Sequence, residues 1–340
     1  MQKIVVSALC IAAVGLVSAK PLDTRQQVPA VYEAGHFYIT LPVHGDQALR
    51  LLVDTGGGGG SGLFVLQAAA AKRLDLKVSQ CGQGDDSMRV VSMPAQLNTV
   101  LAPARETPCH AAAILVDGDL GTDHADGIVG AGYMPGQIWT FDYPQHELWR
   151  EAANWHTKDK SHVIPLELPH DHLGRASGLP RIELRIDGET LPMLLDTGAT
   201  AEATRVGAKA TGDASVHGFG VTSYAPSSLI NRWHAHHKDW PVINDGDRLI
   251  QHMRLIRVPN VEIAGWAAGP VWFTERPDKN IDALSNYMSG TVKGSAGANI
   301  FRHFKMTLDY PAGVAEFSCV RGCREATASK IGETNGDKVP

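Results

Sequence analysis

The chain has 340 residues, of which 44% are hydrophobic and 20% charged, which is ordinary for a globular protein and long enough for two domains. Its formal net charge is −5, and no cluster of Lys and Arg occurs along it. This charge pattern argues against nucleic acid as a partner.

The first 19 residues have the pattern of a secretory signal peptide. Lys3 precedes an apolar run over 4–17, and the run ends in the small-residue sequence Val17-Ser18-Ala19. The run is shorter than the roughly 18 residues that indicate a membrane span, and no later segment is longer. We therefore expect an exported protein, periplasmic or extracellular, with no membrane attachment after cleavage. Residues 20–36 are predicted to be an N-terminal extension.

Four cysteines follow the signal, and an even number in an exported protein favours disulfides. Of the three possible connectivities, the local pairs Cys81–Cys109 and Cys319–Cys323 are favoured, because the two groups lie far apart in the sequence. A zinc site usually has tighter Cys/His spacing, so no metal is expected.

The sequence contains an internal repeat. "ITLPVHGDQALRLLVDTG" (39–56) resembles "IELRIDGETLPMLLDTG" (182–198). Each segment alternates apolar and polar residues, passes a turn and runs apolar into Asp-Thr-Gly. Both are typical of a β-hairpin that leads into a loop.

A second pair of segments matches at a constant offset of 167 positions. "GIVGAGYM" (127–134) with a later "FDYP" corresponds to "GSAGANIF" (294–301) with a later "LDYP". The chain is therefore predicted to form two related lobes, over 37–160 and 161–318. The second lobe holds about 25 extra residues, predicted as a surface loop or lid around 228–248. Residues 319–340 are predicted to be a polar tail, which is disordered over "SKIGETNGDKVP" (329–340).

The two Asp-Thr-Gly motifs suit one kind of chemistry. Peptide hydrolysis without a metal or a nucleophilic side chain needs one group that takes a proton from water and one that gives a proton to the carbonyl oxygen. Two carboxyl groups held close together cannot both ionise, so they share a proton and can do both. Asp54 and Asp196 would supply one carboxyl group from each lobe.

The neighbouring residues fit this arrangement. The hydroxyls of Thr55 and Thr197 are expected to bond across to the opposite loop. Gly56 and Gly198 would let the two backbones approach closely.

On these motifs the chain resembles the pepsin-like and retropepsin-like aspartic proteases, particularly bacterial exported members, over about 37–317. The resemblance implies a mainly β, two-lobed fold with pseudo-twofold related β-barrel lobes. It implies that Asp54 and Asp196 are the catalytic pair, acting through an activated water.

The resemblance also implies how the rest of the site is built. Ile128, Val129 and Gly130, with Gly297 in the second lobe, would pack under the two loops. A peptide or protein substrate would lie extended between the lobes under a flap from residues 84–102. A monomer without a cofactor is expected.

Two positions depart from that family's pattern. Gly57 follows the first motif where a hydroxyl or alanine is common, and Ser295-Ala296 replaces an apolar pair. We expect Gly57 to leave its loop loose, with Gly57→Ser preserving or raising turnover. These departures leave a different class of function open, that of an exported two-lobed protein that binds peptides without cutting them.

Two other motifs have weaker support. Gly57, Gly59 and Gly62 match the dinucleotide pattern G-x-G-x-x-G, but the second lobe repeats Asp-Thr-Gly without the glycine run. The histidines of "WHAHHKDW" (233–240) lack a Cys or Glu at ligand spacing and are predicted to be solvated loop residues.

Overall fold

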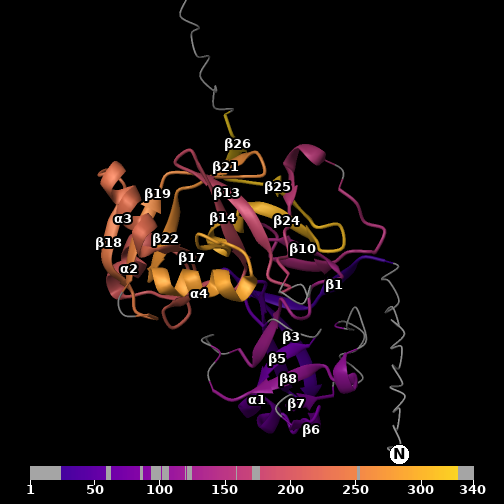
Figure 1. Cartoon of the computed structure of the whole chain (residues 1–340). Helices are drawn as coiled ribbons and strands as arrows, with labels where there is room; N and C mark the ends of the chain where they lie inside the picture. The colour runs from indigo at the N-terminus through magenta and orange to yellow at the C-terminus, as the bar shows by residue number, and fades with distance from the viewer. Residues whose placement is uncertain are drawn as a thin grey trace, which may run out of the picture.

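The computed structural model describes residues 24–58, 63–84, 87–92, 101, 107–118, 120, 125–157, 159–170, 177–250 and 253–327. The expected signal peptide, glycines 59 and 60 and most of the expected flap lie outside these ranges. The fold is mainly β and has two lobes, as predicted. In Figure 1 the indigo and purple strands of the first lobe lie below, and most of the second half lies above and to the left. Within the described ranges, no helix has the length and apolar character needed to cross a membrane.

The first lobe is built on an eight-stranded sheet in the order β2-β3-β4-β9-β5-β8-β7-β6. Strands β3 and β4 form the hairpin predicted from the first repeat. The short helix α1 follows β5, and a disulfide joins Cys81 at the end of β6 to Cys109. The bounds are β2 (Ala30–Glu33), β3 (His36–His44), β4 (Gln47–Asp54), β5 (Phe64–Gln67), α1 (Ala68–Arg73), β6 (Val78–Cys81), β7 (Met88–Val91), β8 (Ala113–Val116) and β9 (Gly127–Gly130).

The second lobe is built on a ten-stranded sheet in the order β18-β19-β22-β17-β23-β14-β13-β20-β21-β26. Strands β13 and β14 form the second predicted hairpin, which turns at Asp187-Gly188, both in the left-handed region that a tight hairpin turn needs. The bounds are β13 (Arg181–Ile186), β14 (Glu189–Asp196), β17 (Ser223–Pro226), β18 (Val242–Asp247), β19 (Met253–Val258), β20 (Val261–Ile263), β21 (Trp266–Ala268), β22 (Val271–Arg276), β23 (Ser295–Gly297) and β26 (Cys323–Glu325).

Helices and one small ribbon complete the second lobe. They are the ribbon of β15 (Thr200–Glu202) and β16 (Phe219–Val221), and helices α2 (Arg205–Thr211), α3 (Ser227–His236), α4 (Asp278–Met288) and α5 (Ala298–Phe301). In Figure 1, α2 and α3 lie beside β18 and β19, and α4 lies along the lower side of this lobe.

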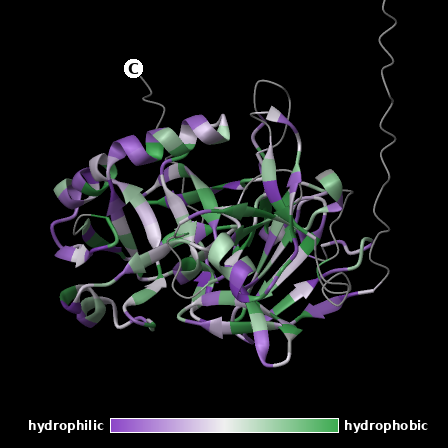
Figure 2. Ribbon diagram, turned by 90° about the horizontal axis from the view of Figure 1, so that it is seen from below, coloured by the Kyte–Doolittle hydropathy of each residue, from purple (hydrophilic) through white to green (hydrophobic). Residues whose placement is uncertain are grey.

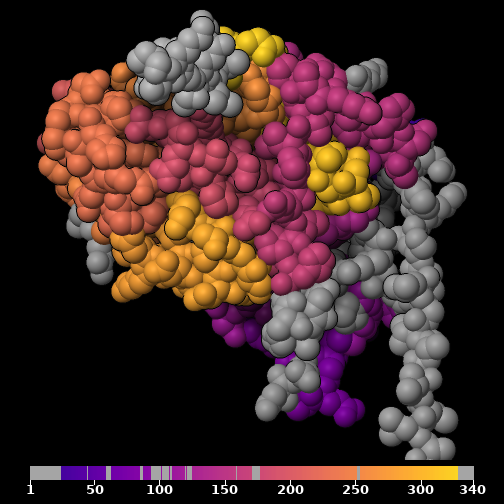
Figure 3. All heavy atoms as spheres, turned by 45° about the horizontal axis from the view of Figure 1, so that its top comes forward, coloured from indigo at the N-terminus to yellow at the C-terminus, as the bar shows by residue number. Residues whose placement is uncertain are grey.

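A six-stranded sheet joins the two halves, with three strands from each. Its order is β1-β11-β10-β24-β25-β12, and the central β10–β24 pair connects residues from opposite halves. The bounds are β1 (Gln26–Val28), β10 (Ile138–Asp142), β11 (Glu147–Arg150), β12 (Val163–Pro165), β24 (Phe304–Asp309) and β25 (Val314–Cys319). Figure 3 shows purple atoms of the first half against orange atoms of the second half at the lower side of the molecule.

The largest hydrophobic cluster runs continuously from one half into the other. It includes Phe37, Phe141 and Tyr143 of the first half together with Phe301 and Phe317 of the second. Figure 2 shows hydrophobic residues along the inner strands and hydrophilic residues on outward helix faces and loops. Burial of this apolar surface holds the two halves in a fixed relation.

The extra segment of the second lobe is not the loop or lid that we expected. Residues 227–236 form helix α3, and residues 242–247 form the edge strand β18. Leu229, Ile230 and Trp233 lie on one face of α3 and are buried, and Trp240 is buried beyond the helix. Four large apolar side chains give this segment a core of its own, so it packs on the sheet.

Both predicted end segments contribute strands. Residues 26–28 and 30–33 of the expected extension pair with β11 and β3. Residues 323–325 of the expected tail form β26 on the edge of the large sheet, and the Cys319–Cys323 disulfide lies next to it. Short segments can add to these sheets because open sheet edges offer unpaired N–H and C=O groups.

Candidate active site

The two Asp-Thr-Gly loops begin at equivalent points of equivalent strand pairs. β4 runs parallel to β9 with Asp54 opposite Gly130, and β14 runs parallel to β23 with Asp196 opposite Gly297. A Cβ atom at Gly130 would overlap the carbonyl oxygens of Gly57 and Asp54. One at Gly297 would overlap the carbonyl of Thr222. These glycines therefore let a strand pass directly under each loop.

Thr55 and Thr197 bond across between the two loops. The backbone N–H of Thr55 donates to Thr197 Oγ1 at 3.1 Å, and the N–H of Thr197 donates to Thr55 Oγ1 at 3.0 Å. Each hydroxyl then donates to a carbonyl of the opposite strand, Leu195 at 2.6 Å and Val53 at 2.8 Å. Both threonines are buried, so water does not compete for these four bonds.

The loops bring the two carboxyl groups together. The N–H of Gly56 donates to Asp54 Oδ1 at 2.8 Å, and the N–H of Gly198 donates to Asp196 Oδ1 at 3.2 Å. A Cβ at Gly198 would overlap the Asp54 carboxyl group, and a Cβ at Gly56 would overlap that of Asp196. Each glycine therefore faces the acid of the other half, and only a residue without a side chain fits there.

The two carboxyl groups differ in how they hold a proton. Burial raises the pKa of Asp54, while the N–H groups of Gly56, Gly198 and Gly57 and the Asp196 side chain lower it again. Burial, the charge of Asp54 and the hydrogen bond to it raise the pKa of Asp196 well above its ordinary value. The pair therefore shares one proton and one negative charge over a range of pH.

Ser295 contacts the pair, which the sequence did not predict. This buried hydroxyl hydrogen-bonds to Asp196 and lowers the pKa of its carboxyl group. The apolar pair expected under the second loop would lack this donor. Ser295, which departs from the family's apolar pattern, therefore makes a polar contact to Asp196. The only signal in the sequence was the comparison of the two lobes, because the first lobe has Ile128 at the equivalent position.

Gly57 does not make its loop loose. A Cβ at Gly57 would overlap Asp54 Oδ2, and the Gly57 carbonyl accepts from the N–H of Ala131 at 2.9 Å. The geometry argues against the expectation that Gly57→Ser preserves or raises turnover, because a side chain here requires the Asp54 carboxylate to move.

Two equivalent tyrosines lie near the acids. Tyr143 and Tyr310 belong to the repeated Asp-Tyr-Pro motifs, and both are buried. The pKa of Tyr143 is raised mainly by burial and further by Tyr32 and Asp196. The pKa of Tyr310 is raised mainly by burial and further by the charge of Asp54. The repeat thus places a neutral phenol near each carboxyl group.

The other expected site residues occupy the predicted neighbourhood. Ile128 and Val129 are buried on β9 beside β4, with Ile128 in contact range of Gly58. Of the expected flap, β7 is described and pairs with β6 and β8. Residues 93–100 of the expected flap lie outside the described residues, as do Gly59 and Gly62 of the dinucleotide pattern.

The histidine-rich segment lies on α3 and the turn that follows it rather than in a loop. His237 stacks on Trp240 with ring centres 4.3 Å apart and pairs with Asp187 at 2.8 Å. Among the described residues, no three His, Cys, Asp or Glu side chains lie close enough to hold a metal ion.

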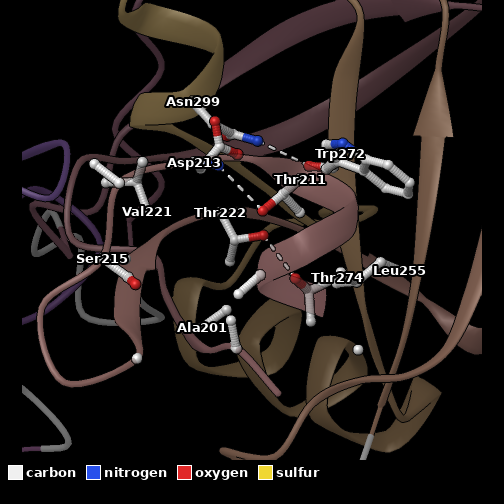
Figure 4. Close-up of a pocket in the computed structure, with 16 residues that line it drawn as sticks. Ala201, Thr211, Asp213, Ser215, Val221, Thr222, Leu255, Trp272, Thr274 and Asn299 are labelled. Carbon is white, nitrogen blue, oxygen red and sulfur yellow. Dashed lines mark hydrogen bonds between the residues drawn. The ribbon is translucent and has the colours of Figure 1, made fainter. Parts of the chain in front are cut away.

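A cavity of about 40 Å³ lies behind the second Asp loop (Figure 4). Ala201, Val221 and Thr222 contribute to its wall, and the Thr222 and Thr274 hydroxyls face each other at 2.6 Å. Neither acid lines this cavity.

Comparisons with known proteins give structural matches only. Neither a scan against protein-family models nor a search of curated proteins finds a match. An aspartic proteinase from Irpex lacteus matches with 12% identity over 88% of this chain and 98% of its own, at a TM-score of 0.43. Basic 7S globulin from soybean matches with 10% identity over 88% of this chain and 95% of its own, at a TM-score of 0.42.

Proposed function

We propose that the chain is an aspartic endopeptidase that hydrolyses peptide bonds in extended polypeptides. The observation that carries the proposal is the pair Asp54 and Asp196, held by matching loops from the two halves with one shared proton. The two loops come from opposite halves of the molecule and are joined by hydrogen bonds beside the acid pair. We propose further that the protein is exported and acts as a monomer on peptide or protein substrates.

The two acids have different roles at the start of the reaction. Asp54, whose charge is stabilised by three backbone N–H groups, takes a proton from a bound water, and the water oxygen attacks the peptide carbonyl carbon. Asp196 gives its proton to the carbonyl oxygen, which forms a neutral tetrahedral diol. Asp54 then gives the proton it took from water to the nitrogen, Asp196 takes a proton from one hydroxyl of the diol, and the C–N bond breaks, which leaves the pair with one shared proton as at the start.

The test is cleavage of an unfolded, fluorescently labelled protein by the purified protein between pH 3 and pH 7, with and without pepstatin. We expect pepstatin-sensitive cleavage, and a loss of at least about 100-fold in kcat for Asp54→Asn and for Asp196→Asn, because each removes one proton-transfer group. Asp142→Asn is the matched control, since Asp142 accepts a turn bond from the N–H of Gln145.

The outcomes separate the two classes of function. Equal, pepstatin-insensitive cleavage by wild type and both variants would mean that a contaminant cuts the substrate, and the proposal would fail. Binding of pepstatin or unfolded peptide by calorimetry without any cleavage would instead identify a peptide-binding protein.

A further inference from the structure

One buried histidine has no part in the chemistry above. His36 begins β3 directly after the Ala34-Gly35 turn of the first half, and only 3% of its surface is exposed. A buried polar side chain is costly unless it is hydrogen-bonded, so its partners indicate why it is there.

The His36 ring bonds to the opposite half of the molecule. Its Nε2 lies 3.1 Å from Thr200 Oγ1, four residues beyond Asp196. The Thr200 hydroxyl donates its one hydrogen to the Gly198 carbonyl at 2.7 Å. Thr200 Oγ1 must therefore accept from His36, which places a proton on Nε2. Burial lowers the pKa of His36 to about 4, while the backbone carbonyls of Ala199 and Gly198 act in the opposite direction.

The turn before His36 docks on the same part of the second half. The N–H of Val221 donates to the Ala34 carbonyl at 3.2 Å, and a Cβ at Gly35 would overlap the Val221 side chain. Val221 pairs with Thr200 in the β15–β16 ribbon. The turn and the ring therefore touch both strands of the ribbon that follows the second Asp loop.

The β15–β16 ribbon has a cavity on its other side, so the hydrogen bonds from the first half contribute more to holding the ribbon in place. Ala201 and Val221 border the cavity, so that side of the ribbon lacks close packing (Figure 4). Polar contacts hold Thr200 instead: its N–H donates to the Tyr224 hydroxyl at 2.8 Å, and its hydroxyl contacts His36.

We propose that His36 is a positioning residue for the second Asp loop, acting through Thr200 and the Gly198 carbonyl. The chain His36–Thr200–Gly198 holds the carbonyl of Gly198, and the N–H of the same residue donates to Asp196. A side chain of the first half thereby sets the geometry of the acid of the second half. The effect of His36 on catalysis rests on the proposed function, whereas its effect on the geometry of the loop does not.

The experiment compares three variants. His36→Leu removes the donor, His36→Gln can place an amide N–H where Nε2 lies, and His236→Leu makes the same change at an exposed position of α3. Hydrogen exchange of peptides covering 196–202 measures the loop directly, and cleavage of the labelled protein gives kcat and KM. Thermal unfolding of each variant shows that it is folded at the assay temperature.

We expect His36→Leu to speed exchange across 196–202 and to lower kcat at least about 10-fold with KM within about 2-fold. His36→Gln should restore both readouts to within about 3-fold of wild type, and His236→Leu should change neither. Unchanged exchange in folded His36→Leu, or failure of His36→Gln to restore it, would overturn the inference. Absence of cleavage in wild type would refute only the proposed function, because the exchange comparison still tests the positioning role.

Discussion

The hydroxyls of Thr140 and Thr307 lie 2.8 Å apart at the centre of the six-stranded sheet, and the two residues are equivalent in the two halves. The pairing of β10 with β24 is symmetrical about them, with Ile138 opposite Asp309 and Asp142 opposite Lys305. An approximate twofold axis therefore passes through this pair and, further along, between Asp54 and Asp196. The site is symmetrical in its backbone, and single side chains make its two acids different.

Removing a threonine hydroxyl from between the Asp loops should cost stability. Thr55→Val deletes the donor to the Leu195 carbonyl and the acceptor of the Thr197 N–H. Each buried group left without a partner costs about 1–3 kcal/mol, so we expect a loss of roughly 2–6 kcal/mol in urea unfolding.

Thr197→Val should behave alike, and the double variant should lose less than the sum because the bonds are reciprocal. Additive losses would show that the two threonines act independently. Ser318→Ala, on the exposed face of β25, is the control.

A side chain at Gly57 should lower activity. Gly57→Ser and Gly57→Ala both introduce a Cβ that overlaps Asp54 Oδ2, so the carboxylate must move. We expect kcat to fall at least about 10-fold, because misplacement of a reacting group by an ångström is that costly.

The matched control is Gly188→Asn, at an exposed turn with open space and a left-handed backbone that Asn tolerates. Wild-type kcat for Gly57→Ser would show that the loop accommodates a side chain after all.

Loss of the Ser295 hydroxyl should shift the pH dependence of cleavage. The hydroxyl lowers the pKa of Asp196, so Ser295→Ala raises it. Asp196 must be protonated to act as the acid, and the upper apparent pKa of kcat/KM should therefore move upward. The measurement is a full pH–rate profile, with Ser318→Ala as the control; a shift downward would contradict the assigned contact.

Neutralising one acid should stabilise the protein at neutral pH. The pKa of Asp196 is raised on folding, so the stability linked to its proton is present below about pH 4 and is lost as the pH rises through the raised value. Asp196→Asn has no carboxyl group to ionise at this position, so its stability does not fall in this way as the pH rises. We expect its free energy of unfolding to exceed that of wild type at pH 7 and the difference to shrink at pH 4, in parallel chemical denaturation series. A difference that is the same at both pH values would point to a cause other than titration.

His36 should have the opposite effect on stability. Its pKa is lowered to about 4, so the unfolded chain takes up this proton near pH 6.5 while the folded chain does not. Stability therefore falls as the pH drops from about 6.5 to about 4, by about 3 kcal/mol over the interval. His36→Gln cannot titrate, and we expect its unfolding free energy to be less steeply pH-dependent there. An identical slope in wild type and His36→Gln would show that other groups account for the acid dependence.

The features that could be predicted from the sequence are those that occur in both copies of the internal repeat. Two copies of an apolar strand ending in Asp-Thr-Gly, with glycine segments at a constant offset, predict two lobes and a shared acid pair. The disulfides followed from their short separations. These features depend on local pattern, which a single sequence displays.

The remainder depends on contacts between distant residues. The role of Gly57 is set by the space beside Asp54, and that of Ser295 by the parallel register of β23 with β14. His36 reaches Thr200 across 164 positions. The polar residues of β26 have no strand pattern of their own and become a strand by pairing with β21. Of these features, only the apolar spacing of α3 could be recognised in the sequence, and its histidine-rich surroundings were interpreted as a loop.

The central pairing of β10 with β24 determines how the molecule would respond to a broken chain. The first three strands of the six-stranded sheet precede the connection between the halves, and the other three follow it. A proteolytic nick between β11 and β12 cuts no ladder hydrogen bond, because each strand keeps its partners. The two fragments should stay associated without a covalent link, co-elute as one particle and separate only in denaturant.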